Sequence, residues 1–412
     1  MRVAANGKDN WRLETLENVC AQVTDGKHGD CQDEPNSGFY FLSCKDVSGG
    51  KLHYEGARQI TEADFLETHR RTKFAPADIL ITNSGTIGRM ALAPDDELTR
   101  RTTFQKSVAI LKPFVDRVEP NFLYYALQAD IRRLVEFAGG TAQKNLLLRD
   151  LRAFEVPVPP LPVQRRIAGI LSAYDELIEN SQRRIRILEA MARALYCEWF
   201  VRFPGHAKHP RVAASLGDIP KGWEVKKLGD LITLNRRPTK RDAHLENRRY
   251  VPIDCLPPKS LALLEAKPIE EAQSSLQLFE KGDILFGAMR PYFHKVVVAP
   301  FAGVTRTTCF VFKPVRPEWH AFATMTVFDD ETVAYANSYS QGATIPYAVW
   351  DGSLSEMPIV LPSHGVLQRF EDVVAPMLSR LAQSFFTFGN LRRTRDLLLR
   401  RLLSGQIEVG AA

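Results

Sequence analysis

Six short loops of the sequence combine basic residues with small polar residues and glycine. They are "TDGKHGD" (24–30), "TNSGTIGR" (82–89), "GGTAQKN" (139–145), "NRRPTKRD" (235–242), "GAMRPYFHK" (287–295) and "SYSQGAT" (338–344). Arg and Lys side chains bond guanine edges, Asn and Gln bond adenine edges, and glycine lets the backbone approach phosphates. The loop 235–242 alone places four cations in eight residues, enough for a local phosphate footprint. Together these loops predict nucleic-acid binding, although any one of them taken alone is more typical of a solvated charged turn.

The residues expected to contact DNA are the basic, amide, hydroxyl and aromatic side chains of these loops. They are Lys27, His28, Asn83, Ser84, Thr86, Arg89, Gln143, Lys144, Asn145, Asn235, Arg236, Arg237, Lys240, Arg241, Arg290, Tyr292, Lys295 and Gln341. What favours binding over solvated turns is that the loops recur at equivalent places in the two halves of the chain, as described below.

Catalytic motifs are absent from the sequence. It contains no phosphate-binding P-loop, no dinucleotide fingerprint, no H-E-x-x-H and no G-x-S-x-G. One alternative stays open: Asp254, Glu265 and Lys267 resemble the carboxylate, carboxylate and lysine set that holds the metal of a nuclease. The same short pattern is also typical of a solvated turn and helix face. We therefore expect no catalytic residue and no metal site, with a metal-dependent nuclease as the alternative.

Bulk composition sets limits on the class of protein. The 412 residues suffice for two or three domains, and 45% hydrophobic with 25% charged residues is typical of a globular protein. The net charge of +6 is compatible with a polyanion partner without requiring one. The six cysteines form no C-x-x-C pair, and no apolar run is long enough to span a membrane. We expect reduced thiols in a cytoplasmic protein.

The chain repeats itself in sequence order. "WRLETL" at Trp11 returns as "WEVKKL" at Trp223, and "FAPADILIT" around Asp78 returns as "FEKGDILFG" around Asp283. "FEVPVPPLPVQRRI" returns as "SEMPIVLPSHGVLQRF". The offsets stay between 201 and 212 residues, as loop differences between two copies of one fold would produce. Segments 39–47, 78–92 and 107–114 have strand patterns and 120–138 has helical spacing, which predicts an α+β domain in each copy.

Each copy is followed by a long stretch with a heptad seam. After Pro162 the apolar residues are spaced alternately three and four apart, and the second stretch shows the same register except at Arg392 and Arg395. We expect an antiparallel helix pair, bent at Pro376 and Gly389 in the second helix and ending at Gly405. The alternative is that each helix packs only on its own domain. The residues expected to form the coiled coil and bind partners are Gln164, Ile167, Leu171, Tyr174, Ile178, Ile185, Leu188, Leu195, Trp199, Leu381, Phe385, Leu399 and Leu402.

Several of these segments resemble one known family over essentially the whole chain. Residues 156–200 are similar to the central conserved region of the specificity subunits of type I restriction–modification systems, and 390–407 resemble their C-terminal counterpart. "PADILITNSGTIGR" and "KGDILFGAMRPYFHK" match the strand and loop that recur in the family's target recognition domains. The sequence departs from the pattern at Ala77, where the family usually has glycine before the aspartate.

The resemblance implies an architecture: two similar α/β target recognition domains separated by a pair of long antiparallel coiled-coil helices, with an internal pseudo-two-fold repeat. The expected boundaries are 1–155 for the first recognition domain, 156–203 for the central helix, 204–216 for a linker, 217–357 for the second recognition domain and 358–412 for the C-terminal helix.

The resemblance also implies a function. Family members bind an asymmetric, bipartite DNA sequence, one half-site per recognition domain, and are themselves non-catalytic. Two modification subunits, which methylate adenine with S-adenosylmethionine, assemble on the helices, and ATP-hydrolysing restriction subunits join them. The expectation is therefore that S-adenosylmethionine, ATP and Mg²⁺ bind to partner subunits and no cofactor binds to this chain. Besides the nuclease, a second alternative is an inhibitor that binds the modification subunit without DNA.

Overall fold

The structure is a computed structural model, and it describes residues 11–136, 145–202, 211–214, 216–240, 245–272, 275–342 and 344–409. The chain forms two compact units, the first from residues 1–176 with 393–412 and the second from residues 177–392. Two long helices, α7 (Leu161–Tyr196) and α11 (His364–Leu403), each contribute one end to each unit. The helices are therefore integral to both units.

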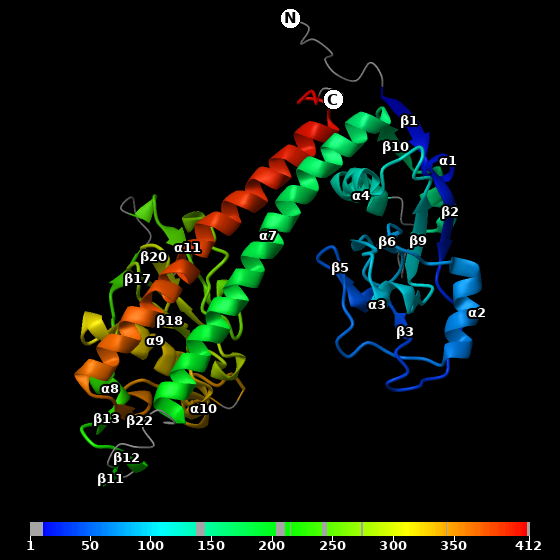
Figure 1. Ribbon diagram of the computed structural model, residues 1–412. Helices are drawn as coiled ribbons and strands as arrows, with labels where there is room; N and C mark the ends of the chain where they lie inside the picture. The colour runs from blue at the N-terminus through cyan, green and yellow to red at the C-terminus, as the bar shows by residue number, and fades with distance from the viewer. Residues whose placement is uncertain are drawn as a thin grey trace, which may run out of the picture. The chain divides into compact units, whose positions relative to one another are not determined.

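The first unit is built on a four-stranded antiparallel sheet in the order β2-β9-β6-β7 (Figure 1). Its strands are β1 (Arg12–Thr15), β2 (Cys20–Asp25), β3 (Tyr40–Leu42), β4 (Val47–Ser48), β5 (Lys51–Leu52), β6 (Ile79–Thr82), β7 (Met90–Leu92), β8 (Thr102–Phe104), β9 (Val108–Pro113) and β10 (Glu155–Val158). Its shorter helices are α1 (Leu16–Val19), α2 (Glu62–Thr72), α3 (Glu97–Arg100), α4 (Pro120–Ala129), α5 (Ile131–Glu136) and α6 (Leu148–Ala153). All four residues of β6 are buried, so both faces of this central strand are covered.

The second unit repeats this plan, with a sheet in the order β14-β21-β18-β19. Its strands are β11 (Arg211–Ala214), β12 (Gly217–Pro220), β13 (Glu224–Lys227), β14 (Ile232–Leu234), β15 (Pro238–Thr239), β16 (Arg249–Tyr250), β17 (Leu276–Phe279), β18 (Ile284–Gly287), β19 (Val296–Val298), β20 (Gly303–Arg306), β21 (Cys309–Pro314) and β22 (Pro358–Leu361). Its shorter helices are α8 (Leu228–Leu231), α9 (His320–Phe328) and α10 (Asp330–Ser338). Part of the expected linker, 211–214, forms a hairpin with β12.

The hydrogen bonds of the two units confirm the internal repeat. In each unit the first strand pairs antiparallel with the strand that leads into a long helix, β1 with β10 and β13 with β22. Each sheet also carries the same crossing bonds: the amide of Leu146 donates to the Asn83 carbonyl at 2.8 Å, and that of Ala348 donates to the Ala288 carbonyl at 2.8 Å. Equivalent backbone bonds in equivalent places show that one fold has been duplicated.

Ala77 shows the local consequence of the departure noted in the sequence. It has a φ of 70°, and Gly282 at the equivalent place has a φ of 90°. The Ala77 amide donates to the Ala93 carbonyl, just after β7, at 3.0 Å. The Gly282 amide donates to the Ala299 carbonyl, just after β19, at 2.9 Å. The turn before the buried aspartate therefore keeps its left-handed conformation, which is unfavourable for a residue that has a Cβ.

The expected helix over 120–138 is divided in the structure. Pro120 occupies its first turn as predicted, but α4 ends at Ala129 and α5 begins at Ile131. Asp130 lies between them. Its amide donates to the Ala126 and Leu127 carbonyls, its carbonyl accepts from the Leu134 amide at 3.1 Å, and its carboxylate accepts from Arg133 Nε at 2.7 Å. This side-chain bond stabilises the break, which the apolar spacing alone does not indicate.

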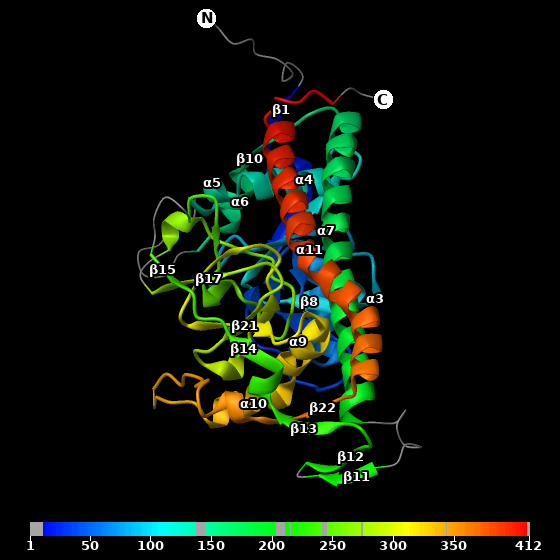
Figure 2. The ribbon, with the colours of Figure 1, turned by 90° about the vertical axis from the view of Figure 1, so that its left-hand side faces the viewer.

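The two long helices pack against each other as an antiparallel pair within each unit (Figures 1 and 2). In the first unit Ile167 and Leu171 of α7 share a core with Leu399 and Leu402 of α11. In the second unit Ile185 of α7 and Leu381 of α11 belong to one core. The helices also pack on the sheet and shorter helices of each unit. The antiparallel pair and the packing of helices on the domains, which were alternatives from the sequence, therefore occur together.

The predicted seam is buried or half-buried along its length. Buried members are Ile167, Leu171, Ile185, Leu381, Phe385, Leu399 and Leu402, and half-buried members are Tyr174, Ile178, Leu188, Leu195 and Trp199. After Tyr196, α7 continues as a π-helical turn, Cys197–Val201. α11 ends at Leu403, followed by Gly405 with a φ of 70°, the expected glycine stop.

An ion pair fills the predicted seam where its apolar register breaks. Arg395 of α11 lies 3.5 Å from the carboxylate of Asp175 on α7, and its side chain is only 17% exposed. The same carboxylate accepts a 2.7 Å hydrogen bond from the Tyr125 hydroxyl of α4. Arg395 also lies 3.1 Å from Asp396 of its own helix. Because Arg395 is largely withdrawn from water, its pairing with Asp175 favours the register that brings the two side chains together.

Gln164 and Glu371 attach the long helices to helix N-termini. Gln164 is buried, and its Oε1 accepts from the backbone amide of Glu119, at the start of α4, at 2.9 Å. Glu371 Oε2 accepts from the amide of Ala321, in the first turn of α9, at 2.7 Å. Acceptors are favoured there because the first amides of a helix have no partner within the helix.

Glu371 makes the stability of the second unit depend on pH. Burial raises its pKa to about 7, with a smaller contribution from the nearby carboxylates of Asp372 and Glu318. A folded-state pKa above the unfolded value means that the folded chain binds more protons, so stability falls as pH rises from about 4.5 to 7. We expect Glu371→Gln to remove this decline, a relative gain of about 1–2 kcal/mol at pH 7.5 over pH 5 after discounting for solvent screening.

Urea unfolding of the variant and of the natural chain at the two pH values measures this difference. The control is Glu246→Gln, which changes an exposed glutamate of the same unit. Equal pH dependence in Glu371→Gln and in the natural chain would show that Glu371 does not bind the proton on folding.

Candidate nucleic-acid interface

The loops predicted to bind DNA follow equivalent strand ends in the two units. Residues 83–89 connect β6 to β7, and residues 288–295 connect β18 to β19. Each loop is joined to a second predicted loop: Ser84 bridges to Asn145 in the first unit, and Met289 and Gln341 both bridge to Tyr347 in the second. The fold therefore brings together residues about 60 and 50 positions apart in sequence, as expected for a composite surface at the end of a sheet.

In the first unit the loop after β6 is a compact turn with exposed side chains at its tip. The hydroxyl of Thr82 accepts from the amide of Arg89 at 2.9 Å, which closes the loop. Thr86 and Arg89 are exposed and Ser84 is half-buried. Asn83 is buried, and its Oδ1 has no hydrogen-bond partner among the described residues. Thr86 and Arg89 are therefore the side chains of this loop available to a ligand.

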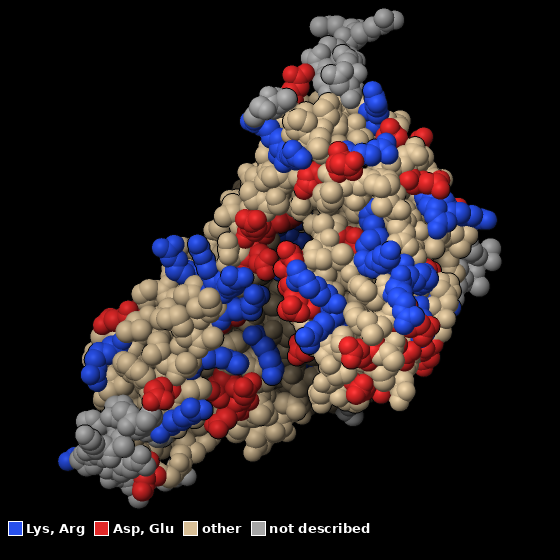
Figure 3. Space-filling view, turned by 45° about the vertical axis from the view of Figure 1, so that its right-hand side comes forward, with Lys and Arg blue, Asp and Glu red and all other residues tan. Residues whose placement is uncertain are grey.

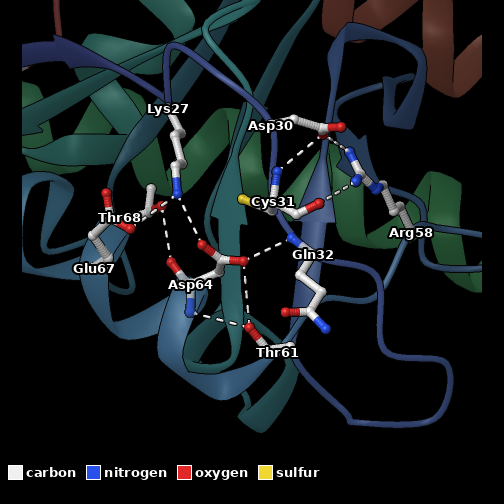
Figure 4. A network of polar contacts seen from close by, with 9 residues as sticks. All are labelled: Lys27, Asp30, Cys31, Gln32, Arg58, Thr61, Asp64, Glu67 and Thr68. Carbon is white, nitrogen blue, oxygen red and sulfur yellow. Dashed lines mark hydrogen bonds and ion pairs between the residues drawn. The ribbon is translucent and has the colours of Figure 1, made fainter.

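The loop after β2 holds its basic residues in internal contacts (Figure 4). Lys27 Nζ lies 2.9 Å from Asp64 and 3.0 Å from Glu67, both on α2, and its side chain is 17% exposed. The Asp64 hydrogen bond raises the pKa of Lys27, so the ammonium stays charged. His28 is exposed, and its Nε2 lies 2.7 Å from the Asp25 carboxylate. Lys27 thus fastens the loop to α2.

Gly26 and Arg58 also fix the shape of the loop after β2. A Cβ on Gly26 would lie 2.0 Å from the Phe104 carbonyl oxygen, so only glycine fits between β2 and β8. Arg58 bonds Asp30 at 2.6 Å and the Cys31 carbonyl at 2.5 Å (Figure 4). These contacts give the loop a defined shape in which His28 and Gly29 remain at the surface.

In the second unit two of the predicted cations form ion pairs and a third bonds a backbone carbonyl. Arg236 forms an ion pair with Asp351, and Arg237 lies 3.2 Å from Glu280. Lys295 Nζ donates to the Ile253 carbonyl at 2.9 Å and is half-buried. Lys240 is exposed. The arginine pairs are themselves exposed, so a phosphate can compete for them at little cost, whereas Lys295 holds its loop in place.

The loop after β18 presents an aromatic tip. Tyr292 is 51% exposed and Phe293 45% exposed, with their ring centroids 4.7 Å apart. Arg290, which precedes them, has a φ of 52° and donates its amide to the Pro346 carbonyl at 2.7 Å. Gln341 is exposed, and Asn235 and Asn145 are half-buried. Three predicted residues, Gln143, Lys144 and Arg241, lie outside the described residues.

Sequence reasoning missed several exposed and cavity-lining aromatic residues of the second unit. Tyr339 is 56% exposed beside the loop that carries Gln341. Tyr347, Phe310 and Trp350 line a cavity of about 500 Å³ next to the loop that carries Arg236. An aromatic residue in a strand or turn has the same sequence signature whether it fills a core or lines a cavity, so no signal distinguished them.

Charge is distributed in patches of both signs on the face drawn in Figure 3, where groups of Lys and Arg side chains alternate with carboxylates. Such interleaving agrees with the ion pairs described above. On this face the Lys and Arg side chains do not form one continuous basic surface.

Two of the three residues of the nuclease alternative have other partners. Lys267 lies 3.4 Å from Glu271, and Glu265 lies 3.7 Å from Arg392. Within the described ranges no group of three or more His, Cys, Asp or Glu residues is arranged to hold a metal ion. The geometry therefore does not favour this alternative.

Two further observations concern predictions made from composition. All six cysteines lie among the described residues and none forms a disulfide, in agreement with the prediction of free thiols. Over the described parts of the chain, no helix combines the length and apolar character that crossing a membrane requires.

Comparison with known proteins shows which proteins the chain is similar to. Residues 10–190 match the type I restriction modification DNA specificity domain. The MjaIX specificity subunit of a type I restriction enzyme from Methanocaldococcus jannaschii is 26% identical over 386 residues, which cover 90% of this chain and 87% of that protein. The EcoBI specificity subunit from Escherichia coli is 24% identical over 225 residues, covering 50% of this chain and 47% of that protein.

The fold agrees with a solved relative. The crystal structure of a type I restriction–modification S subunit from M. genitalium superposes with a TM-score of 0.63 over 98% of each chain, at 17% sequence identity. The chain is thus similar in sequence and in fold to type I restriction–modification specificity subunits, the family that its sequence motifs resemble. Its α+β fold with two similar units and paired long helices is the fold of that S subunit.

The contacts of Lys27 lead to a prediction that separates a structural role from a DNA contact. Lys27→Met keeps the aliphatic chain but leaves Asp64 without its cation, so we expect the free energy of unfolding to fall by about 1–2 kcal/mol. Thermal and urea unfolding measure the loss. Lys106→Met, an exposed lysine of the same unit, is the control and should stay within about 0.5 kcal/mol of the natural chain. Unchanged stability together with weaker DNA binding would instead place Lys27 at the DNA.

Proposed function

We propose that this chain is the DNA-specificity subunit of a type I restriction–modification complex and binds a bipartite, asymmetric DNA target, one half-site per unit. The observation that carries the proposal is the duplicated framework with different loops on it. The backbone bonds at Asn83 and Ala288 are the same in both units, but Ser84, Thr86 and Asn145 in one correspond to a loop with Arg290, Tyr292 and Tyr347 in the other. Two such surfaces would bind two different base sequences.

The long helices would set the separation of the half-sites. α7 has 36 residues, about 54 Å at 1.5 Å per residue. DNA converts separation into rotational phase, one turn per ~10.5 base pairs, so a stiff connection would accept one spacer and a flexible one would accept many. The Asp175 and Arg395 pair, which favours one alignment of the helices, supports such a role.

The exposed face of α7 is suited to binding partner subunits. Leu177, Ile187 and Met191 are 51%, 50% and 47% exposed, and their spacing places them along one side of the helix. Exposed apolar side chains aligned on a helix are typical of an interaction surface. We assign it to modification subunits, two per chain, with restriction subunits joining the complex. S-adenosylmethionine, ATP and Mg²⁺ would be bound by those partners, and this subunit would not itself be catalytic.

Duplicating one recognition unit within the chain tests the assignment of half-sites. We expect that replacing residues 11–155 with residues 223–356 of the same chain converts the target into two copies of the second half-site. Selection from a pool of random DNA duplexes, using the chain assembled with its modification subunits, identifies the target. Cooperative thermal unfolding of the chimera is checked first. Loss of both half-sites in a folded chimera would contradict independent units.

Lengthening both helices tests the proposed spacing role. Four residues inserted after Glu176 in α7 and four before Arg393 in α11, where each helix passes between units, add about 6 Å. We expect a longer preferred spacer, by one or two base pairs, with both half-site sequences unchanged. Insertion into α7 alone is the control and should weaken binding because it shifts the seam. An unchanged spacer in the double insertion would refute the role.

A further inference from the structure

The second unit contains a cavity of about 500 Å³ that its fold does not fill. It lies among the end of β14, the loop 235–238, the turn between β20 and β21, and residues 347–351. Its volume is within the range of small-ligand sites, roughly 300–1,000 Å³. The loop at its edge carries Arg236, Arg237 and Lys240, which belong to the candidate interface. The cavity therefore opens beside basic side chains of the candidate interface.

Three aromatic rings form the apolar wall of the cavity, and each is packed or hydrogen-bonded in place. Phe310 and Trp350 are each only 8% exposed, and both pack on Phe312, at centroid distances of 5.7 and 4.9 Å. The Tyr347 hydroxyl donates to the Thr307 carbonyl, and its ring lies 6.3 Å from that of Phe310. Preformed aromatic walls of this kind favour a flat, polarisable ligand.

Polar groups complete the lining. Gln277 is buried, and its Nε2 donates to the carbonyls of Cys309 and Arg306, which fixes the carboxamide and leaves its oxygen as the acceptor it can offer. Asp351 and Arg236 form an exposed ion pair at the edge, with side chains 71% and 60% exposed. Carboxylate and carboxamide oxygens accept from the amino groups of bases, and arginine binds a phosphate.

The aromatic wall is present in one unit only. The equivalent backbone bonds of Ala348 and Leu146 place Asn145 where the second unit has Tyr347. The pairing of Thr82 with Val108 and of Gly287 with Cys309 places Ala109 where the second unit has Phe310. The backbone framework is thus shared by the two units, whereas the aromatic wall is not. Two units that bind different base sequences must differ in such side chains.

We propose that this cavity binds a nucleobase, held between the aromatic wall and the Gln277 and Asp351 oxygens, with its phosphate toward the 235–240 loop. The inference rests on the proposed function and deepens it: one base of the second half-site leaves the duplex stack and enters the cavity. The ligand is a nucleobase in either case, supplied by the DNA target or by a free nucleotide. Unstacking is least costly where the base is already unpaired, which provides the test.

The experiment measures binding of the assembled complex to duplexes of the selected target, with a single mismatch at each position of the second half-site in turn. A base that enters the cavity binds more tightly when mismatched, by about tenfold, because its pairing no longer has to be broken. At contacted bases that stay stacked, each mismatch weakens binding, by about tenfold or more. Weakening at every position, with no nucleotide binding, overturns the proposal.

Two variants assign the effect to this cavity. Tyr347→Leu removes one ring of the wall and should abolish the tightening. Val315→Ala, at an exposed apolar residue of the same unit outside the cavity, should retain it. Asp351→Asn changes an exposed position and should not affect folding. It should reduce the tightening caused by the mismatch several-fold. Tightening that persists in both Tyr347→Leu and Asp351→Asn would belong to a base bound by a partner subunit and would overturn the assignment.

Free nucleotides separate the two sources. If dAMP, dGMP, dCMP or TMP at millimolar concentration raises the melting temperature of the natural chain but not of Tyr347→Leu, while no mismatch tightens binding, the cavity binds a nucleobase from a free nucleotide. If the complex binds the selected target specifically, but no mismatch tightens binding and no nucleotide raises the melting temperature, this inference is overturned and the proposed function stands. Absence of any sequence-specific binding overturns the proposed function as well.

Discussion

The antiparallel contact between α7 and α11 is the interaction on which both units depend. Each unit completes its core with one end of each helix: Leu171 and Leu402 in the first, Ile185 and Leu381 in the second. A buried apolar seam alone does not fix the alignment of two helices, because neighbouring heptads are similar. The Arg395 and Asp175 pair, joined by the Tyr125 hydroxyl, adds that restriction. The same contacts therefore hold the cores together and set the helix register.

Much of this architecture is predictable from the sequence because it depends on periodicity. Apolar spacing of three and four indicated the helices, and repeated segments indicated two copies of one fold. Arg395 looked like an irregularity only because Asp175, its partner, lies on the other helix. The break at Asp130 was missed for a similar reason, since a single side-chain bond to Arg133 stabilises it.

The site was less predictable, because the state of a charged side chain depends on distant partners. Lys27 is paired with Asp64 and Glu67, which lie 37 and 40 residues away, and Lys295 donates to the Ile253 carbonyl, 42 residues away. Residue type identified the loops correctly as surface connections at equivalent strand ends. It did not identify which cations hold the loop and which, like Arg89 and Lys240, face solvent. Duplication helps here: positions with identical backbone bonds form the framework, and positions that differ around them are candidates for specificity.

Native-state hydrogen exchange tests most directly whether the long helices are integral to both cores. If they are, amides of residues 163–175 and 396–403 should exchange with the same free energy of opening as those of β6 and β9. Residues 185–196 and 366–381 should likewise exchange together with β18 and β21. Exchange of the helical amides at a much lower free energy, while the sheets stay protected, would show that the helices are peripheral additions and would contradict the account.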